Sequence, residues 1–463
     1  MSISNWNGSN RCTPTAIAVP RNPDELIAVV RDTAAYPSPV RAVGELHSLN
    51  ESIETRGTAV FMTHFDAIGE PDRRRNTVTV GAGVRMIDLK NALKRHGLQL
   101  PVVPEIGNAT AGSVACCGTK DSSLGLTGRG QISSTVVEVR MVAADGRVVH
   151  VTDPDELRLV RSSYGLLGII YEVTFEVETR KKVLYEYERI KLDRWLKTGD
   201  PIPPPASADI LGGADGFLGF LLPYRGELIV ERRRLARAHD PILIWDRLKL
   251  WMRTFAWTTG ARPFNAPLRL LPRRLRRWCI DRWISILDRG FLKVFFLSFL
   301  SRFESYRADA MIDFKRPVSS YFDFTFWAFP VGTWDKVVPA YLRFCERFER
   351  ESGGFRPALP TEVYFIRKDD RGVLSFSFDE DIFTLDMVNW SDDEPACWAS
   401  MNRAFNEFAA QHGGRPLLNQ TKMLQQTVAM QVWTEGWHML SRERCAADPH
   451  ERFLTPFLKG LLP

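Results

Sequence analysis

The stretch RAVGELHSLN at residues 41–50 places a histidine, His47, in a loop that follows a strand-like segment and Gly44. A histidine in such a loop can be a structural residue, a metal ligand, a catalytic base or the point where a cofactor is held. Its surroundings must distinguish these roles. Two further glycine-containing turns follow strands in the N-terminal part of the chain, PEIGNATAGSVACCG at 104–118 and YGLLG at 164–168.

These three turns suggest a common chemical use. Glycine lets the backbone approach a ligand closely, and exposed backbone N–H groups bind anions such as a pyrophosphate. None of the turns has the GxGxxG spacing between a strand and a helix, and none has the spacing of a P-loop. The sequence therefore favours a phosphate-bearing ligand on a fold other than the Rossmann fold.

The composition restricts the class of protein. The chain has 463 residues, enough for two or three domains, and its 44% hydrophobic and 25% charged residues are ordinary for a soluble globular protein. Seven cysteines include one adjacent pair, Cys116-Cys117, and no CxxC or Cys/His cluster with zinc spacing. We therefore expect a reducing cytoplasm, with no disulfide framework and no metal site. The polar start predicts no signal peptide, and the apolar run VFFLSFL at 294–300 is too short to span a bilayer.

Hydrophobic periodicity predicts strands and helices in both halves of the chain. In the first half we expect a helix after Asn22-Pro23, a helix from about Met86 to Gly97, and a hairpin within 134–152 that turns at Asp145-Gly146. The character of the sequence changes after Thr179. The elements expected there are a loop at 198–209, two strands within 216–233, a strand and a helix within 321–348, strands within 360–390 and a helix at about 395–412.

One segment stands apart by its charge. Residues 231–290 hold 15 Lys or Arg and 5 Asp or Glu, and five of the 13 tryptophans: Trp245, Trp251, Trp257, Trp278 and Trp283. At helical spacing Trp245, Leu248, Trp251 and Met252 share one face. Such a helix can lie at an anionic membrane surface, or it can be a cap insertion whose apolar face packs on the rest of the protein. An arginine cluster alone does not indicate nucleic acid, and we expect none.

The sequence resembles the vanillyl-alcohol-oxidase-type flavoproteins over roughly residues 13–178. The resemblance rests on the segments PRNPDELIAVV, AVGELHSLN, VTVGAGVRMIDLKNAL, PEIGNATAGSVACCGT, VRMVAADGRVV and YGLLGIIYEVTFEV, in the order and spacing of that family. Within the family it is most similar to the sugar-lactone and alditol oxidases. That similarity rests on NWNG near the start, G-x-x-H-S at 44–48, FLLPYRGELIV, DFTFWAFP, GGRP at 413–416 and ADPHERFLTPFL at 447–458.

The resemblance implies an α+β fold that binds FAD. It implies a two-subdomain FAD-binding domain of the PCMH type at 1–179 and an α+β substrate cap at 180–412. The cap would contain the basic Trp-rich insertion at about 235–305, and residues 413–463 would return to the flavin domain. His47 matches the histidine that carries the flavin 8α-methyl group covalently in these oxidases, and a non-covalent contact is the alternative.

The resemblance also implies which residues bind the cofactor. The first loop would hold the pyrophosphate, the second would line the flavin and ribityl chain, and the third would close over the adenosine side and the ring edge. The predicted residues are Val43, Gly44, Glu45, Leu46, His47 and Ser48 in the first, Pro104, Thr110, Gly112, Ser113, Cys116, Cys117 and Gly118 in the second, and Gly168, Ile169 and Ile170 in the third.

The chain departs from the sugar-oxidase pattern in three places. Lys120-Asp121 stands where the family has His-Gly, GGRPLLNQTK lacks the usual His and Trp of the tail, and the cap strand has Tyr364 in place of an arginine. We predict Lys422 as the cation that stabilises the reduced flavin and Glu362 as the partner of the substrate hydroxyl, with Gln420 and Tyr364 as further catalytic candidates.

The expected function is an FAD-dependent oxidoreductase that oxidises an alcohol carbon by hydride transfer to flavin N5, with O₂ or another acceptor reoxidising the flavin. A small-molecule alcohol is the expected substrate. The alternatives are a membrane-associated flavoenzyme acting on a lipid-linked or hydrophobic substrate, peripheral on the inner face of the membrane, and a flavin-binding protein without turnover. The sequence does not give the substrate, the electron acceptor or the oligomeric state.

Overall fold

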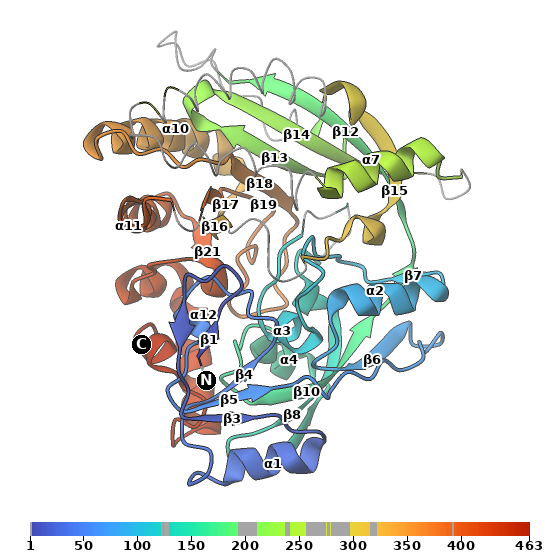
Figure 1. Ribbon diagram of the computed structural model, residues 1–463, viewed down its shortest axis with the longest axis vertical. Helices are drawn as coiled ribbons and strands as arrows, with labels where there is room; N and C mark the ends of the chain where they lie inside the picture. Colours follow the sequence, from blue (N-terminus) through green and yellow to red (C-terminus); the bar gives the residue numbers. More distant parts are fainter. Residues whose placement is uncertain are drawn as a thin grey trace.

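The computed structural model describes residues 2–121, 124, 129–192, 211–236, 241–255, 275, 278, 297–314, 322–390 and 393–463. The loop expected at 198–209 and much of the basic Trp-rich segment, with Trp257 and Trp283, lie outside these ranges. Figure 1 shows a large sheet in the upper half of the molecule, two smaller sheets in the lower half, and helices α10, α11 and α12 along one side.

Two small sheets build the N-terminal lobe. The parallel sheet has the order β3 (Ala16–Ala18), β5 (Thr58–Phe61), β4 (Val40–Val43). The antiparallel sheet has the order β6 (Thr77–Gly81), β10 (Ile169–Glu176), β8 (Val136–Val142), β9 (Val148–Val151). The expected hairpin is confirmed, because β8 and β9 are paired from Val142 and Val148 with Asp145-Gly146 at the turn.

The helices of this lobe form where the sequence predicts them. In α1 (Pro23–Arg31) the Asn22 side chain accepts a hydrogen bond from the Glu25 backbone N–H, and the apolar face is buried. Helix α2 (Met86–Arg95) is followed by Gly97, which has the left-handed backbone that ends a helix. The remaining elements of the lobe are β1 (Ile3–Ser4), β2 (Arg11–Cys12), β7 (Leu98–Gln99), α3 (Ala111–Cys116), α4 (Pro154–Val160) and β11 (Glu178–Thr179).

An eight-stranded sheet forms the cap. Its order is β15 (Arg302–Tyr306), β12 (Lys182–Lys191), β14 (Glu227–Leu235), β13 (Gly216–Leu222), β18 (Thr361–Ile366), β19 (Ile382–Thr384), β17 (Trp327–Pro330), β21 (Arg415–Pro416). The two-stranded sheet β16 (Phe322–Thr325) and β20 (Met387–Trp390) lies beside it. The cap helices are α7 (Ile244–Phe255), α10 (Trp334–Glu351) and α11 (Pro395–Gln411).

The C-terminal segment contacts both lobes. It contains β21, α12 (Gln426–Ala447) and α13 (Pro456–Lys459), and β21 completes the edge of the cap sheet. At the other end the Val40 backbone N–H donates to the Arg452 carbonyl at 2.7 Å, and the Arg452 side chain donates to the carbonyls of Val29 and Val30. The same segment therefore ties the cap to the sheet that carries β4.

Buried charges also join the two lobes. Arg233 of β14 and Arg307 after β15 bind Glu105 of the N-terminal lobe, with nitrogen–oxygen distances of 2.6 and 3.3 Å. Arg307 also binds Asp121. Arg253 of α7 binds Glu231 of β14 at 2.9 Å. Removing one partner of a buried ion pair typically costs about 3–5 kcal/mol, so this network fixes the cap above the loop that begins at Pro104.

Candidate cofactor and substrate site

The three glycine turns meet at one narrow cleft. The end of β4, the loop that follows it, the region around α3, the turn before β10 and two residues of the C-terminal segment line it. Fourteen of the sixteen residues predicted to bind the cofactor line this cleft: Val43, Gly44, Glu45, Leu46, His47, Ser48, Thr110, Gly112, Ser113, Cys116, Cys117, Gly168, Ile169 and Ile170. Pro104 and Gly118 belong to the same loop but are not among the lining residues.

Close packing explains why the first loop needs Gly44. A Cβ atom at this position would lie 2.4 Å from the Thr110 Oγ1 atom and 2.7 Å from the Ser113 Oγ atom. Those two hydroxyl groups are themselves hydrogen-bonded at 2.9 Å. The loop can therefore lie against the start of α3 only because residue 44 has no side chain.

His47 is held by segments from both ends of the chain. Its ring is half-buried and lies 5.6 Å from the Trp6 ring, measured between centroids. The backbone on either side is fixed by hydrogen bonds from Trp6 N–H to the Leu46 carbonyl at 3.0 Å and from the Asn5 amide to the Ser48 carbonyl at 3.1 Å. The next residue but one, Leu49, donates its N–H to the Asn419 carbonyl at 2.9 Å. The loop geometry is thus set by the N-terminal hairpin and the tail together.

Arg41 is a site residue that the sequence analysis missed. It lines the cleft from β4, and its guanidinium donates to the Tyr164 carbonyl in the third turn. Burial lowers the pKa of Arg41, and the neighbouring Cys117 and Cys116 oppose this shift. Glu45 also lines the cleft, but no ion pair joins Arg41 to a carboxylate among the described residues, so the position suits an anionic ligand group. The sequence does contain a signal for this residue: Arg41 is the one charged residue of β4 and lies three residues before Gly44.

The adjacent cysteines lie on the wall of the same cleft. Their sulfur atoms are 3.9 Å apart, and the Cys116 thiol donates to the Gly112 carbonyl at 3.3 Å. Their mutual hydrogen bond lowers the pKa of Cys116 and raises that of Cys117. Both are free thiols, and they are the small polarisable groups on this part of the cavity wall.

The predicted catalytic residues lie in three places. Gln420 lines the cleft, whereas Lys422, Glu362 and Tyr364 do not. The Lys422 ammonium instead donates to the Asp323 carboxylate at 2.7 Å and to the Ser9 hydroxyl at 3.2 Å. Glu362 and Tyr364 lie on β18 of the cap, where the Tyr364 hydroxyl donates to Glu362 at 3.3 Å.

A second charged pair adjoins Glu362. Lys120, which stands where the family has a histidine, binds the buried carboxylate of Asp386. Asp386 and Glu362 exchange two backbone hydrogen bonds of 2.9 Å. Burial raises the pKa of Asp386 to about 7 against the opposing effect of Lys120, and burial also raises the pKa of Glu362. Neither Lys120 nor Asp386 was assigned a catalytic role from the sequence, because 266 residues separate them.

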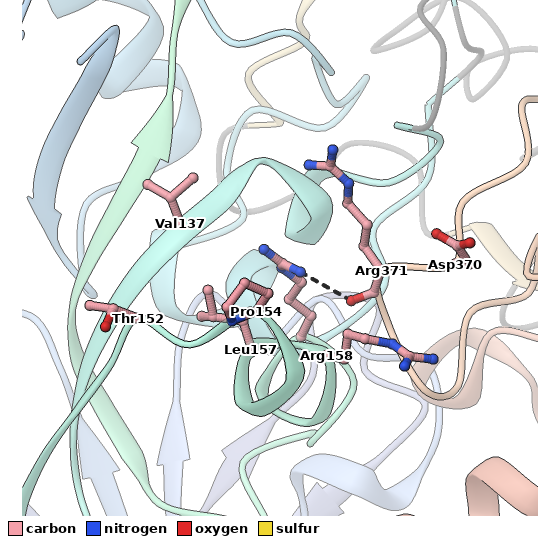
Figure 2. Close-up of a pocket in the computed structure, with 8 residues that line it drawn as sticks. Val137, Thr152, Pro154, Leu157, Arg158, Asp370 and Arg371 are labelled. Carbon is pink, nitrogen blue, oxygen red and sulfur yellow. Dashed lines mark hydrogen bonds between the residues drawn. The ribbon is translucent and has the colours of Figure 1, made fainter. Parts of the chain in front are cut away.

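A second hollow of about 540 Å³ lies beside α4 (Figure 2). Arg161 in its wall is used structurally, donating to the carbonyls of Val136 and Arg371. Figure 2 shows the guanidinium groups of Arg158 and Arg371 pointing in different directions. Volume alone therefore does not make it a binding site.

No metal-binding cluster of His, Cys, Asp and Glu occurs in the described ranges.

Two buried oxygen atoms support a ligand in the cofactor cleft. Asn419 Oδ1 and Gln420 Oε1 have no hydrogen-bond partner among the described residues, although both residues line the cleft. Leaving a buried polar atom unpaired typically costs about 1–3 kcal/mol, which a polar ligand edge would relieve. Together with Arg41 and the close approach at Gly44, these atoms fit the flavin, ribityl and pyrophosphate groups of FAD.

Comparisons with known proteins agree with this geometry. Residues 14–152 match the model of the FAD binding domain family. The L-gulono-1,4-lactone dehydrogenase of Mycobacterium tuberculosis is 30% identical over 251 residues, which cover 53% of this chain and 55% of that enzyme. The alditol oxidase of a Streptomyces species is 34% identical over 183 residues, covering 38% of this chain and 42% of the other. The matches thus span about half the length of these relatives.

Solved structures extend the likeness to the whole chain. A solvent-stable cholesterol oxidase superposes with a TM-score of 0.73 at 17% identity and covers 99% of this chain and 97% of its own. A cholesterol oxidase from Brevibacterium sterolicum gives a TM-score of 0.72 at 15% identity, covering 100% of this chain and 96% of its own. These values confirm the predicted α+β fold.

Proposed function

We propose that this chain, whose residues 14–152 form an FAD-binding domain, is an FAD-dependent oxidoreductase acting on CH–OH groups. The observation that carries the proposal is the single cleft in which all three glycine turns meet. FAD bound there would accept a hydride from an alcohol carbon, and O₂ or another acceptor would reoxidise it. The names of the relatives make a sugar lactone or an alditol the first substrate class to test.

The chain's own residues would bind and orient the cofactor. Backbone N–H groups of 43–48 and the Arg41 guanidinium would hold the pyrophosphate, since both present positive charge to the cleft and no described carboxylate forms an ion pair with Arg41. The side-chain oxygens of Asn419 and Gln420 would accept hydrogen bonds from N–H or O–H groups of the flavin part.

We further propose that His47 carries the flavin covalently. Its support is the position of the half-buried ring in the cleft wall, held against Trp6 by a backbone fixed on both sides. A fixed ring keeps the reacting nitrogen in one place, which favours bond formation.

Acid precipitation tests the cofactor and its attachment. The purified protein is precipitated with acid, and the yellow colour is followed in wild type and in His47→Ala. We expect colour in the wild-type pellet and in the His47→Ala supernatant. Colour in the wild-type supernatant would refute the covalent bond and leave FAD binding intact. A colourless protein that does not take up added FAD would refute the function itself.

Turnover is tested separately from binding. The FAD-loaded protein is mixed without O₂ with a panel of L-gulono-1,4-lactone, xylitol and a long-chain alcohol, and bleaching of the flavin is recorded. Bleaching by the lactone or xylitol supports the first substrate class, and bleaching by the long-chain alcohol alone supports a hydrophobic substrate. A flavin that photoreduces but that no alcohol reduces would support a binding protein without turnover.

A second proposal concerns the membrane, and α7 favours it. Its apolar stripe faces outward: Trp245 is 64% and Trp251 is 60% exposed, and the Trp251 and Phe255 rings stack with centroids 5.6 Å apart. Trp245, Leu248 and Trp251 of the predicted face are thus exposed, whereas Met252 is partly buried against the hydrophobic core of the cap. Trp and basic residues on one helix are typical of peripheral binding to anionic lipid. No described helix is long and apolar enough to cross a membrane.

Sedimentation with lipid vesicles tests whether the protein binds a membrane surface that contains anionic lipid. We expect the protein to pellet with phosphatidylcholine vesicles that contain phosphatidylglycerol and less with phosphatidylcholine alone. The double variant Trp245→Ser, Trp251→Ser should lose most of the pelleting. A matched control changes two exposed apolar residues elsewhere, Val19 and Val148, to serine. Equal loss in both variants, or no lipid binding by wild type, would refute the contact.

A further inference from the structure

Asp386 is a fully buried carboxylate of which one oxygen accepts a hydrogen bond and the other accepts none from the described residues. It follows β19, and its Oδ2 atom accepts from the Lys120 ammonium. Its Oδ1 atom has no hydrogen-bond partner among the residues that the structure describes. A buried unpaired oxygen is costly, so its retention points to a use.

The pair lies where the cofactor loop meets the cap. Cys117 and Thr119 line the cofactor cleft, and Lys120 is the next residue along that segment. Its ammonium lies over aromatic rings of the cap, 4.4 Å from the Tyr364 centroid and 5.1 Å from that of Phe326. Lys120 therefore extends from the wall of the cleft to β18 and β19. Neither Lys120 nor Asp386 lines the cleft itself, and an alcohol that reacts with a flavin bound there would have to enter between that wall and the cap.

We propose that Asp386 is the catalytic base that takes the proton of the substrate hydroxyl, and that Lys120 positions it. This inference rests on the proposed oxidoreductase function. As the hydride leaves the alcohol carbon for the flavin, the O–H bond breaks and its electron pair becomes the second carbon–oxygen bond. The proton passes to Asp386 Oδ1. The alcohol loses two electrons and the flavin gains them, so no further oxidant is needed in this step.

Its neighbours explain how the carboxylate is tuned. Burial and, to a smaller extent, the nearby Glu362 raise the pKa of Asp386, while Lys120 and the Thr384 hydroxyl oppose the rise, and the resulting pKa is about 7. A base works best when its pKa is close to the operating pH. Glu362 is the rival base, and one oxygen of each carboxylate accepts a hydrogen bond, from Tyr364 in Glu362 and from Lys120 in Asp386. Asp386 differs in that its second oxygen is buried without a hydrogen-bond partner among the described residues.

The test uses the FAD-loaded protein and needs no substrate. The absorption spectrum of the oxidised flavin is recorded between pH 5 and 9 in wild type and Asp386→Asn. A charge that appears beside the flavin shifts its spectrum. We expect a step near pH 7 in wild type that Asp386→Asn abolishes. The matched control is Asp381→Asn, whose carboxylate binds Arg367 at 2.8 Å in the cap, and it should keep the step.

Lys120→Met is a second variant, for which the direction of the change in the pH midpoint can be predicted. Removing the cation should move the step to higher pH by about one unit or more, because a nearby opposite charge favours the ionised carboxylate. The inference is overturned if wild type has no step, if the step survives Asp386→Asn, or if Lys120→Met leaves the midpoint in place. Absence of bound FAD would instead refute the proposed function, and the inference with it.

Any alcohol that bleaches the flavin adds a kinetic test. We expect Asp386→Asn to slow anaerobic bleaching by about 10²- to 10⁴-fold and to remove its rise with pH near 7. Glu362→Gln should keep that rise if Asp386 is the base. A pH profile lost in Glu362→Gln and kept in Asp386→Asn would assign the role to Glu362 and overturn the inference.

Discussion

The Lys422 ammonium binds the Asp323 carboxylate at 2.7 Å, and both side chains are almost completely buried. Trp398 also donates to that carboxylate at 3.0 Å, and the Asn7 amide donates to its other oxygen at 3.2 Å. The tail lysine thus joins the N-terminal hairpin, β16 and α11 at one point. A structural role is therefore established for Lys422, while its predicted action on reduced flavin stays a prediction.

Breaking this ion pair should destabilise the protein. Lys422→Met leaves a buried carboxylate without its cation, and we expect a loss of about 3–5 kcal/mol in the free energy of unfolding. Lys422→Met with Asp323→Asn removes both charges and should recover much of that loss. Urea unfolding measures both. The predicted action of Lys422 on the flavin is tested by sulfite binding to flavin N5 in the double variant. Weaker sulfite binding than in wild type would place the Lys422 cation near the flavin.

Gly44→Ala should abolish most FAD binding. The added methyl group would lie 2.4 Å from Thr110 Oγ1, so the loop must move away from α3 and the cleft must change shape. Gly332→Ala is the control, because its nearest neighbour would be the Glu380 carboxylate at 4.0 Å. Flavin content per protein, from the ratio of visible to ultraviolet absorbance, measures the effect. Normal flavin content in Gly44→Ala would contradict the close approach.

The sequence could predict the glycine turns that line the cleft because their signals are local, while their binding of a cofactor stays a prediction. A glycine such as Gly44 marks a close backbone approach, and alternation of apolar residues marks the strand that leads to it. Fourteen of the sixteen predicted cofactor residues accordingly line one cleft. The hairpin at Asp145-Gly146 and the helix at Asn22 were predictable for the same reason.

The pair proposed for the substrate chemistry could not be predicted in this way, because its contact is long-range. Lys120 meets Asp386 across 266 residues, and no periodicity reveals such a pair. Helix α7 shows a related limit. Its amphipathic pattern is visible in the sequence, but the structure buries Arg253 to 1% exposure against Glu231 and leaves the tryptophans outside. The spacing of residues defines the two faces of α7, but it does not show which face is buried. The buried Glu231, which binds Arg253, determines that orientation.

Arg41 should contribute to FAD affinity through its charge. In a His47→Ala background, where the cofactor can exchange, we expect Arg41→Met to weaken FAD binding roughly 10- to 100-fold, as for loss of a hydrogen bond to a charged group. Arg41→Lys keeps the charge and should lose less. Equilibrium titration of apoprotein with FAD measures the dissociation constants. Riboflavin, which lacks the pyrophosphate, should bind all three proteins equally, and an effect of Arg41→Met on riboflavin would contradict a pyrophosphate contact.

The raised pKa of Asp386 also predicts how stability depends on pH. In the unfolded chain an aspartate loses its proton near pH 3.9, whereas in the folded protein the pKa is about 7. Between these values the folded state holds a proton that the unfolded state has lost, so this group lowers the free energy of unfolding as pH rises from about 4 to 7. The contribution is about 4 kcal/mol at most and changes little above pH 7. Asp386→Asn cannot titrate, so its stability should fall less steeply than that of wild type over this range in urea unfolding, while Asp381→Asn should follow wild type. Parallel curves for wild type and Asp386→Asn would show that the carboxylate titrates at its ordinary pKa in the fold.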